Sequence, residues 1–150
     1  MSECSIELCF QPNNEQWEAA LKTVPKTPEI HQLPDAWWQL MERTRSSVWQ
    51  TLLERSKNRS RPCIEGWSNN EGILCLDLYS GEEGFDVARA MVEVLHCAGC
   101  QKIQAVVYDD ECEYIIDDEG TKYPIGMQFL ISPSGELVEK DYPEVEYEYV

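Results

Sequence analysis

Two stretches of this chain hold residue types that could do chemistry, and the first is His96-Cys97-Ala98-Gly99-Cys100. Cys-x-x-Cys spacing is used by zinc sites and by thiol-exchange proteins. A thioredoxin-type motif needs its first cysteine at a helix N-terminus, where the helix dipole lowers the thiol pKa. The helical spacing of apolar residues upstream predicts instead that Cys97 lies in the last turn of a helix, where a thiolate is disfavoured.

Zinc binding at Cys97 and Cys100 is the other chemistry that this motif could support. A structural zinc site needs four ligands, usually as two close pairs, and the sequence has no second Cys-x-x-Cys or His pair. Further ligands would have to come from Cys63, Cys75 or Cys112. We interpret Cys97 and Cys100 as buried or semi-buried structural thiols and expect no metal and no cofactor. A small metal-dependent or thiol enzyme built on these two cysteines is kept as an alternative function.

The second stretch is a run of seven carboxylates within residues 109–120. It does not fit an EF-hand, because Tyr114 and Gly120 stand where a calcium loop needs Gly and Glu. The acids could provide solubility and protect sheet edges, form a protein-binding surface, or hold a cation at two hairpin ends. Tyrosine beside carboxylates is typical of protein interfaces. The protein-binding hypothesis assigns the site to Asp109, Asp110, Glu111, Glu113, Tyr114, Asp117, Asp118, Glu119 and Tyr123.

Motifs of hydrolases and nucleotide-binding enzymes are missing from the sequence. It contains no Gly-x-Ser-x-Gly elbow and no Gly-rich loop ending in Gly-Lys-Ser or Gly-Lys-Thr, and its two histidines, His31 and His96, are far apart. We expect no catalytic residues, and the absence of these motifs favours a protein that is not an enzyme.

Charge is divided unevenly along the chain. Residues 71–150 hold 19 acids against four Lys and Arg, a net −15, whereas residues 1–70 hold nine acids against eight Lys and Arg, a net −1. Such a field repels nucleic acid and anionic membranes and attracts cationic partners. We therefore expect a basic protein partner, no direct nucleic-acid binding and no membrane binding.

The leading hypothesis is a non-catalytic acidic binding protein that docks on a basic protein partner and inhibits it. Immunity proteins that neutralise a toxin or nuclease work on this electrostatic principle, and so do acidic mimics of nucleic acid. A cytosolic adaptor or regulator whose acidic surface is merely solubilising is the further alternative. The sequence predicts neither the identity of a partner nor the oligomeric state.

Length and composition predict one domain over residues 1–150. A basic loop at residues 55–62 joins a Trp-rich helical part to an acidic, Tyr-rich and β-rich part, and the tail 141–150 is a candidate mobile terminus. The sequence begins without a signal-peptide pattern and has no long apolar stretch, and its seven cysteines suit reduced thiols. We expect a cytoplasmic location.

The elements that must position these residues follow from apolar periodicity. The most regular pattern belongs to a helix that is capped at Ser80 and ends at Gly99. The run 73–79 is continuously apolar and predicts a central strand covered on both faces. The remaining predictions are helices at 15–22 and 34–55 and strands at 4–10, 103–108, 112–116, 121–123, 127–131 and 136–138. This order predicts an α+β fold with a mainly antiparallel sheet and about three helices packed mostly on one face.

Overall fold

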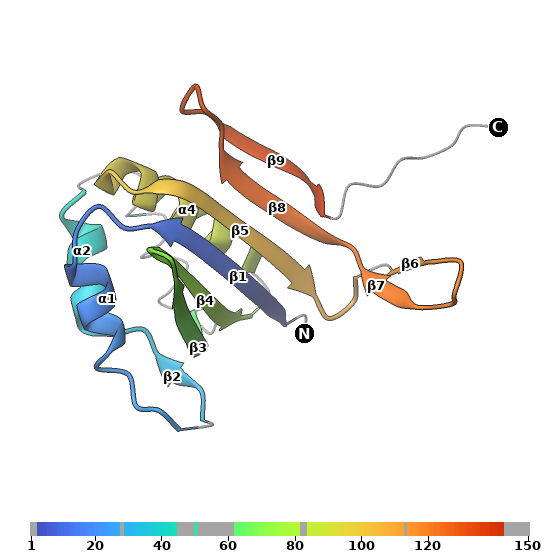
Figure 1. Ribbon diagram of the computed structural model, residues 1–150, viewed down its shortest axis with the longest axis horizontal. Coiled ribbons are helices and arrows are strands. Elements are labelled where there is room, and N and C mark those ends of the chain that lie inside the picture. Colours follow the sequence, from blue (N-terminus) through green and yellow to red (C-terminus); the bar gives the residue numbers. More distant parts are fainter. Residues whose placement is uncertain are drawn as a thin grey trace.

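The computed structural model describes residues 3–27, 29–44, 50, 62–81, 84–112 and 114–142. Seven strands form one antiparallel sheet in the order β2-β3-β4-β1-β5-β8-β9, and β6 with β7 forms a separate two-stranded ribbon (Figure 1). The strands are β1 (Cys4–Gln11), β2 (His31–Gln32), β3 (Cys63–Asn70), β4 (Ile73–Ser80), β5 (Gln101–Asp109), β6 (Tyr114–Ile116), β7 (Lys122–Pro124), β8 (Gly126–Ile131) and β9 (Leu137–Tyr142). The described helices are α1 (Gln16–Leu21), α2 (Asp35–Glu42) and α4 (Gly84–Ala98). The predicted α+β class with a mainly antiparallel sheet is confirmed.

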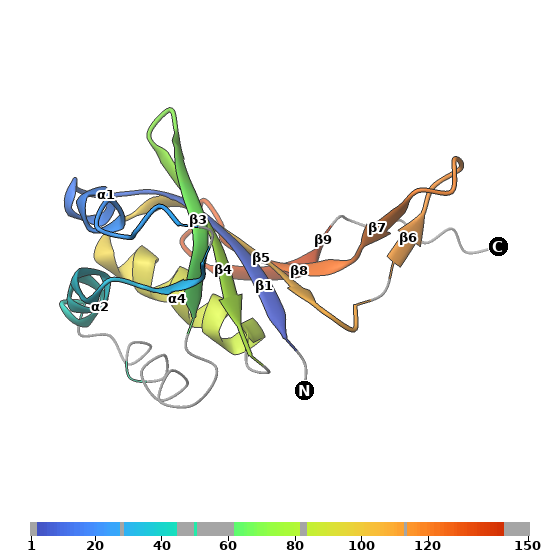
Figure 2. The same cartoon turned by 90° about the horizontal axis from the view of Figure 1, so that it is seen from below.

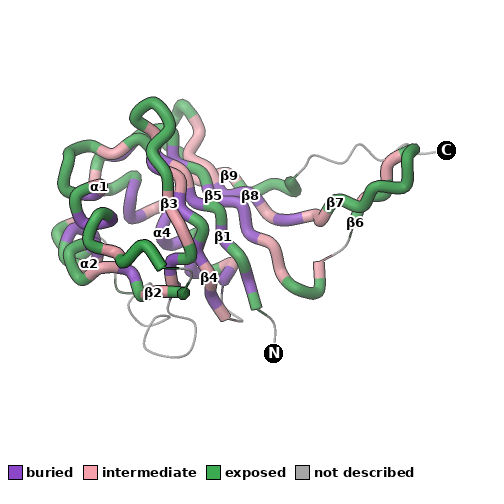
Figure 3. The backbone as a smooth tube through the Cα atoms, turned by 60° about the horizontal axis from the view of Figure 1, so that its bottom comes forward, coloured by how far each residue is buried: buried purple, intermediate pink, exposed green. Residues whose placement is uncertain are grey.

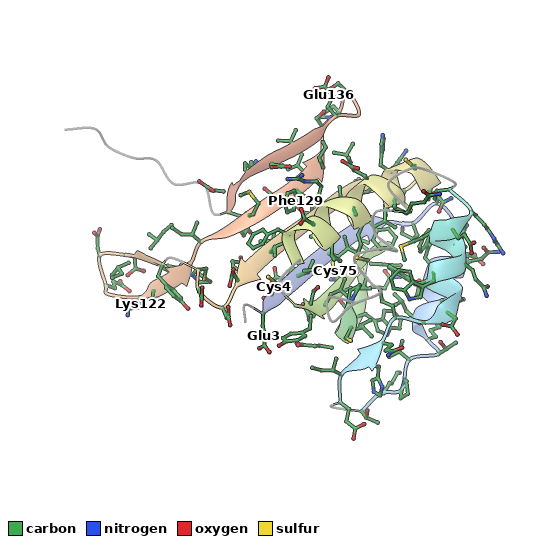
Figure 4. All side chains as sticks on the ribbon, turned by 180° about the vertical axis from the view of Figure 1, so that it is seen from behind. Glu3, Cys4, Cys75, Lys122, Phe129 and Glu136 are labelled. Carbon is green, nitrogen blue, oxygen red and sulfur yellow. The ribbon has the colours of Figure 1, made fainter. Side chains whose placement is uncertain are left out.

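One face of the sheet is buried and the other is open. Along β1 the alternate side chains of Cys4, Ile6, Leu8 and Phe10 are buried, because successive strand residues point to opposite faces. Helix α4 lies across this buried face, behind the sheet in Figure 1 and in front of it in Figure 4. The burial colours of Figure 3 follow the same alternation along the central strands. The three described helices therefore leave the opposite face of the sheet uncovered.

Helix α4 ends as its sequence predicts but begins later. Its last turn closes in a Schellman arrangement, in which the Cys100 amide donates to the Leu95 carbonyl and the Gly99 amide to the His96 carbonyl, both at 3.0 Å. Gly99 takes the left-handed φ of +97° that this ending needs. The predicted cap at Ser80 is wrong, because Ser80 still belongs to β4 and the helix starts at Gly84.

An aromatic cluster at the end of β1 anchors α1 and α2. The rings of Phe10, Trp17 and Trp37 meet edge to face at centroid distances of 5.1–5.9 Å. The buried Trp37 indole donates to the Trp17 carbonyl at 3.0 Å. Asn13 connects this cluster to α4, because its side chain accepts from the Trp17 indole at 2.7 Å and donates to the Ala98 carbonyl at 2.8 Å.

Three predictions about the elements need correction. The strand 73–79 is real, but it is the neighbour of the central strand β1, and its alternate residues Cys75, Asp77 and Tyr79 face the open side. The helix predicted over 34–55 ends at Glu42, where it is followed by a turn, and its later part falls largely outside the described residues. The sequence analysis predicts neither β2 nor β3. Strand β2 has only two residues, and in β3 a register shift between Ile64 and Gly66 breaks the period of two.

Two predicted segments lie mostly outside the described residues. Only Pro62 of the basic loop 55–62 is described, and of the tail only Asp141 and Tyr142, which belong to β9. Across the described ranges, every helix is too short or too polar to cross a membrane.

Removing one ring from the aromatic cluster tests whether the cluster anchors α1 and α2. Replacing the fully buried Phe10 by Ala should lower the free energy of unfolding by about 3–5 kcal/mol, since it leaves a cavity between the two indole rings. The neighbouring Gln11→Ala, at an exposed position of the same strand, should change it by less than about 0.5 kcal/mol. Urea denaturation followed by tryptophan fluorescence measures both, and similar losses for the two variants would contradict the packing described.

Candidate functional site

The open face of the sheet is built from rows of side chains that run across the strands. In the first row Ser5 of β1 stands opposite Tyr79 of β4 on one side and Tyr108 of β5 on the other. The row continues to Gly126 of β8, which is paired with Tyr142 of β9. Tyrosines therefore alternate with small residues along this row, so each ring has room to lie across a neighbouring strand.

Gly126 is small because the Tyr108 ring covers it. A Cβ at this position would meet the Val107 carbonyl oxygen at 2.5 Å and the Tyr108 ring at 2.8 Å. An aromatic ring that shields a strand glycine is held in place by the close approach. The glycine therefore fixes the position of a ring on the open face near the end of β5.

The second row brings two carboxylates together. Glu7 of β1 stands directly opposite Asp77 of β4, and both are exposed on the open face. Like charges in direct opposition on neighbouring strands destabilise a sheet. This part of the surface favours the approach of a positive charge.

A pocket of about 530 Å³ lies beside the start of β1 and the end of β5, and it includes residues of both rows. The Asp110 amide donates to the Glu3 carbonyl at 3.0 Å, which holds the two strand ends together. Among the described residues, the lining contains four carboxylates and three tyrosines but no Lys or Arg: Glu3, Glu7, Asp109, Asp110, Tyr79, Tyr108 and Tyr114, with Cys4, Ser5, Cys112 and Pro124 between them. We call this set the acidic pocket.

Titration shifts in the acidic pocket follow from hydrogen bonds, burial and nearby charges. A hydrogen bond with Glu3, then burial and nearby carboxylates, raise the pKa of Tyr79 from its ordinary 10.0 to about 12. Burial and then the charge of Glu7 raise the pKa of Tyr108. A hydrogen bond with Asp109 lowers the pKa of Asp110. At neutral pH the tyrosines are therefore neutral hydrogen-bonding groups beside an ionised Asp110.

The β6–β7 ribbon projects from the sheet (Figures 1 and 2). Large apolar side chains are exposed along it, with Tyr114 at 55%, Ile116 at 62% and Tyr123 at 48% of full exposure. Tyr114 also lines the pocket, so the base of the ribbon forms one of its walls. A two-stranded ribbon is only marginally stable in isolation, and its exposed apolar surface is typical of contact regions.

Asp117 has a structural role at the tip of the ribbon. Its carboxylate accepts from the amides of Glu119 at 2.9 Å and Thr121 at 2.8 Å, and Gly120 supplies the left-handed φ of +83° that the turn needs. Asp118 and Glu119 are exposed beside it. The acids of the tip are thus separated along the ribbon from those of the acidic pocket.

The predicted site residues divide into several groups. Asp109, Asp110 and Tyr114 meet in the acidic pocket, and Glu111 is exposed in the turn after β5. Asp117, Asp118 and Glu119 occupy the ribbon tip, Tyr123 lies on β7 opposite Ile115, and Glu113 lies outside the described residues. The sequence prediction missed Glu3, Glu7 and Tyr79. Their signal was the period of two in β1 and β4, which places them on the face away from the core.

The Cys-x-x-Cys motif does not bring two like thiols together. Cys97 lies in the last turn of α4, as predicted, but the prediction that it is buried or semi-buried is wrong, because its side chain is exposed. Cys100 is buried, its thiol lies 3.6 Å from the Asn13 side-chain oxygen, and burial raises its pKa to about 11. No group of three or more His, Cys, Asp or Glu in the described part of the chain is arranged to hold a metal ion.

A second concavity, of about 470 Å³, lies between β3 and the connection from α1 to β2. Its lining mixes Lys26 with Glu18 and Glu65, and the Asn69 amide donates to Glu18 at 2.8 Å. His31 also lines it, and it belongs to β2 and contacts the Thr27 hydroxyl at 2.8 Å. The mixed charge and the internal hydrogen bonds distinguish this concavity from the acidic pocket.

Removing the Glu3 carboxylate tests the electrostatics of the acidic pocket. In Glu3→Gln the pKa of Tyr79 should fall from about 12 towards its ordinary 10.0, since the hydrogen bond and charge of Glu3 disfavour the phenolate. The wild type should lose stability as the pH rises between those values, because only the unfolded tyrosine ionises there. NMR titration of tyrosine ring carbons, with Tyr79→Phe to assign the signal, measures the shift. An unchanged Tyr79 pKa in Glu3→Gln would contradict the described contact.

Compared with protein-family models, with curated proteins and with solved structures, the chain matches none. Its function must therefore be inferred from the chemistry of its own surface.

Proposed function

We propose that this protein is a non-catalytic binding protein that docks on a basic protein partner through the acidic pocket and inhibits that partner. One observation carries the proposal: four carboxylates and three tyrosines from separate segments meet in one pocket, and the lining that the structure describes has no Lys or Arg. The proposal places the protein in the cytoplasm.

Electrostatics favour a cationic partner at this pocket. The carboxylates of Glu7 and Asp77 stand in direct cross-strand opposition, and Asp109 and Asp110 are adjacent at the end of β5. Repulsion between Glu7 and Asp77 is relieved when Lys or Arg side chains of a partner reach this surface. The net −15 of residues 71–150 also steers a basic protein towards this surface before contact.

Aromatic and apolar groups supply the contact area that charge alone does not. Tyr79 and Tyr108 lie on the floor of the pocket, and Tyr114 extends it onto the ribbon. Tyrosine buries a large ring on binding while its hydroxyl keeps a hydrogen bond, which is why it often carries binding energy. The exposed Ile116 adds apolar area further along the ribbon.

A basic nuclease or toxin is the kind of partner that this surface suits. The substrate site of a nuclease must attract phosphates, so it presents positive charge that a carboxylate surface can cover. Covering that site would inhibit the partner in the way that an immunity protein or an acidic nucleic-acid mimic does. An adaptor with a merely solubilising acidic surface would not depend on particular acids.

Neutralising the pocket with a matched control tests the proposal. The pocket variant combines Glu7→Gln, Asp109→Asn and Asp110→Asn, and the control combines Glu15→Gln, Glu29→Gln and Glu71→Gln at exposed positions outside the pocket. Both sets change the net charge equally. The pocket variant should slow association with the partner about tenfold or more at low salt and weaken its salt dependence, while the control should change the rate far less.

The measurement begins with affinity capture from a lysate of the source cell, using wild type and both variants at low and high salt. Mass spectrometry identifies a basic protein retained by wild type and by the control, and surface plasmon resonance with the purified partner then gives the rates. Equal loss of binding in the two variants would show that only net charge matters and would reject the pocket as the docking site. A partner whose activity is unchanged by the complex would reject inhibition.

A further inference from the structure

Two cysteines that are distant in sequence lie side by side on the open face of the sheet. Cys9 of β1 stands directly opposite Cys75 of β4, and both are half-buried free thiols. They belong to the third cross-strand row, next to the row of Glu7 and Asp77. Figure 4 labels Cys75 near the middle of the sheet.

The hairpin between β3 and β4 determines how closely the two cysteines approach. Its turn residues Glu71 and Gly72 have φ of +54° and +89°, which is a two-residue type I′ turn closed by the hydrogen-bonded pair Asn70 and Ile73. Hydrogen-bonded and non-hydrogen-bonded pairs alternate along antiparallel strands. The pair after the turn-closing one, Asn69 and Leu74, is therefore non-hydrogen-bonded. The pair that follows it, Ser68 and Cys75, is again hydrogen-bonded.

The backbone groups of Cys75 therefore point towards β3 and not towards β1. On the β1 side, Cys9 and Cys75 form a non-hydrogen-bonded pair, the closer kind, with a typical Cα separation of about 4.5 Å. Disulfides span Cα separations of roughly 4.4–6.8 Å. The two residues can be joined without moving either strand.

Hydrogen bonds distinguish the two thiols. The Asn70 amide lies 3.8 Å from the Cys75 sulfur, as a donor to it. Burial, followed by the hydrogen bond and charge of Cys75, raises the pKa of Cys9 to about 12. Cys9 therefore stays protonated at neutral pH, so we assign the first attack to Cys75 and the second to Cys9.

We propose that Cys9 and Cys75 are an oxidisable dithiol. A low-molecular-weight disulfide such as oxidised glutathione oxidises the pair, and a disulfide bond forms between Cys9 and Cys75 on the open face. The Cys75 thiolate attacks one glutathione sulfur, the glutathione disulfide bond breaks, and the first glutathione leaves. Cys9 then gives its proton to solvent and attacks the Cys75 sulfur of the mixed disulfide, and the second glutathione leaves. Two protein thiols are oxidised while one glutathione disulfide is reduced to two thiols.

Oxidised glutathione itself is the probe in the test. Reduced native protein is treated with it, the remaining thiols are alkylated, and the protein is digested with a glutamyl endopeptidase without reduction. Cleavage after Glu7 separates Cys9 from Cys4, and cleavage after Glu71 separates Cys75 from Cys63. Mass spectrometry should find the Cys9 and Cys75 peptides linked in the wild type. The matched control that combines Cys97→Ser and Cys100→Ser should give the same linked peptides. The variants Cys9→Ser and Cys75→Ser should give none.

A second readout does not require any variant to fold. The disulfide closes a loop of 65 intervening residues, so the oxidised wild type should melt about 10 °C higher than the reduced protein. Absence of the linked peptides, their appearance only under denaturing conditions, or a reaction that stops at glutathione on Cys75 would overturn the proposal. Linkage between Cys97 and Cys100 in their place would also overturn it.

Discussion

Pairing of β1 with β4 on one side and β5 on the other is the constraint on which the rest of the structure depends. Every row of the open face that carries a candidate group passes through β1, at Ser5, Glu7 or Cys9. The same strand gives the core its central apolar residues and carries Phe10 near its end, which anchors α1 and α2 through two indole rings. A shift of one residue in this strand would exchange its core face and its open face.

The division between the two faces explains how the molecule tolerates so much negative charge. Its free energy of folding comes mainly from the apolar face beneath the helices, where water is excluded from a continuous core. The open face can then carry groups that do not help folding, such as the opposed carboxylates of Glu7 and Asp77. Their repulsion lowers the stability of the fold modestly, and it favours the binding of a cationic partner.

Elements with a strong local signal could be predicted from the sequence, and others could not. The period of two in β1 and the 3.6-residue period of α4 each arise from one buried face, so β1 was predicted with bounds close to those observed and α4 with its observed C-terminal end. Strand β3 gave no such signal, because its register shift after Ile64 breaks the alternation and its last residues are polar. The apolar run of β4 was misinterpreted as buried on both faces, because half-exposed Cys75 and Tyr79 are as apolar in sequence as core residues.

The sequence by itself determined the acidity of the second half, the strand and helix periods, and therefore which residues turn away from the core. It could not determine which exposed groups become neighbours, because cross-strand rows depend on long-range backbone hydrogen bonds and on bulges that local spacing does not encode. Cys97 and Cys100, close in sequence, lie in different environments, whereas Cys9 and Cys75 stand opposite each other. Only the tertiary structure joined the carboxylates at the start of β1 to those at the end of β5 in one pocket.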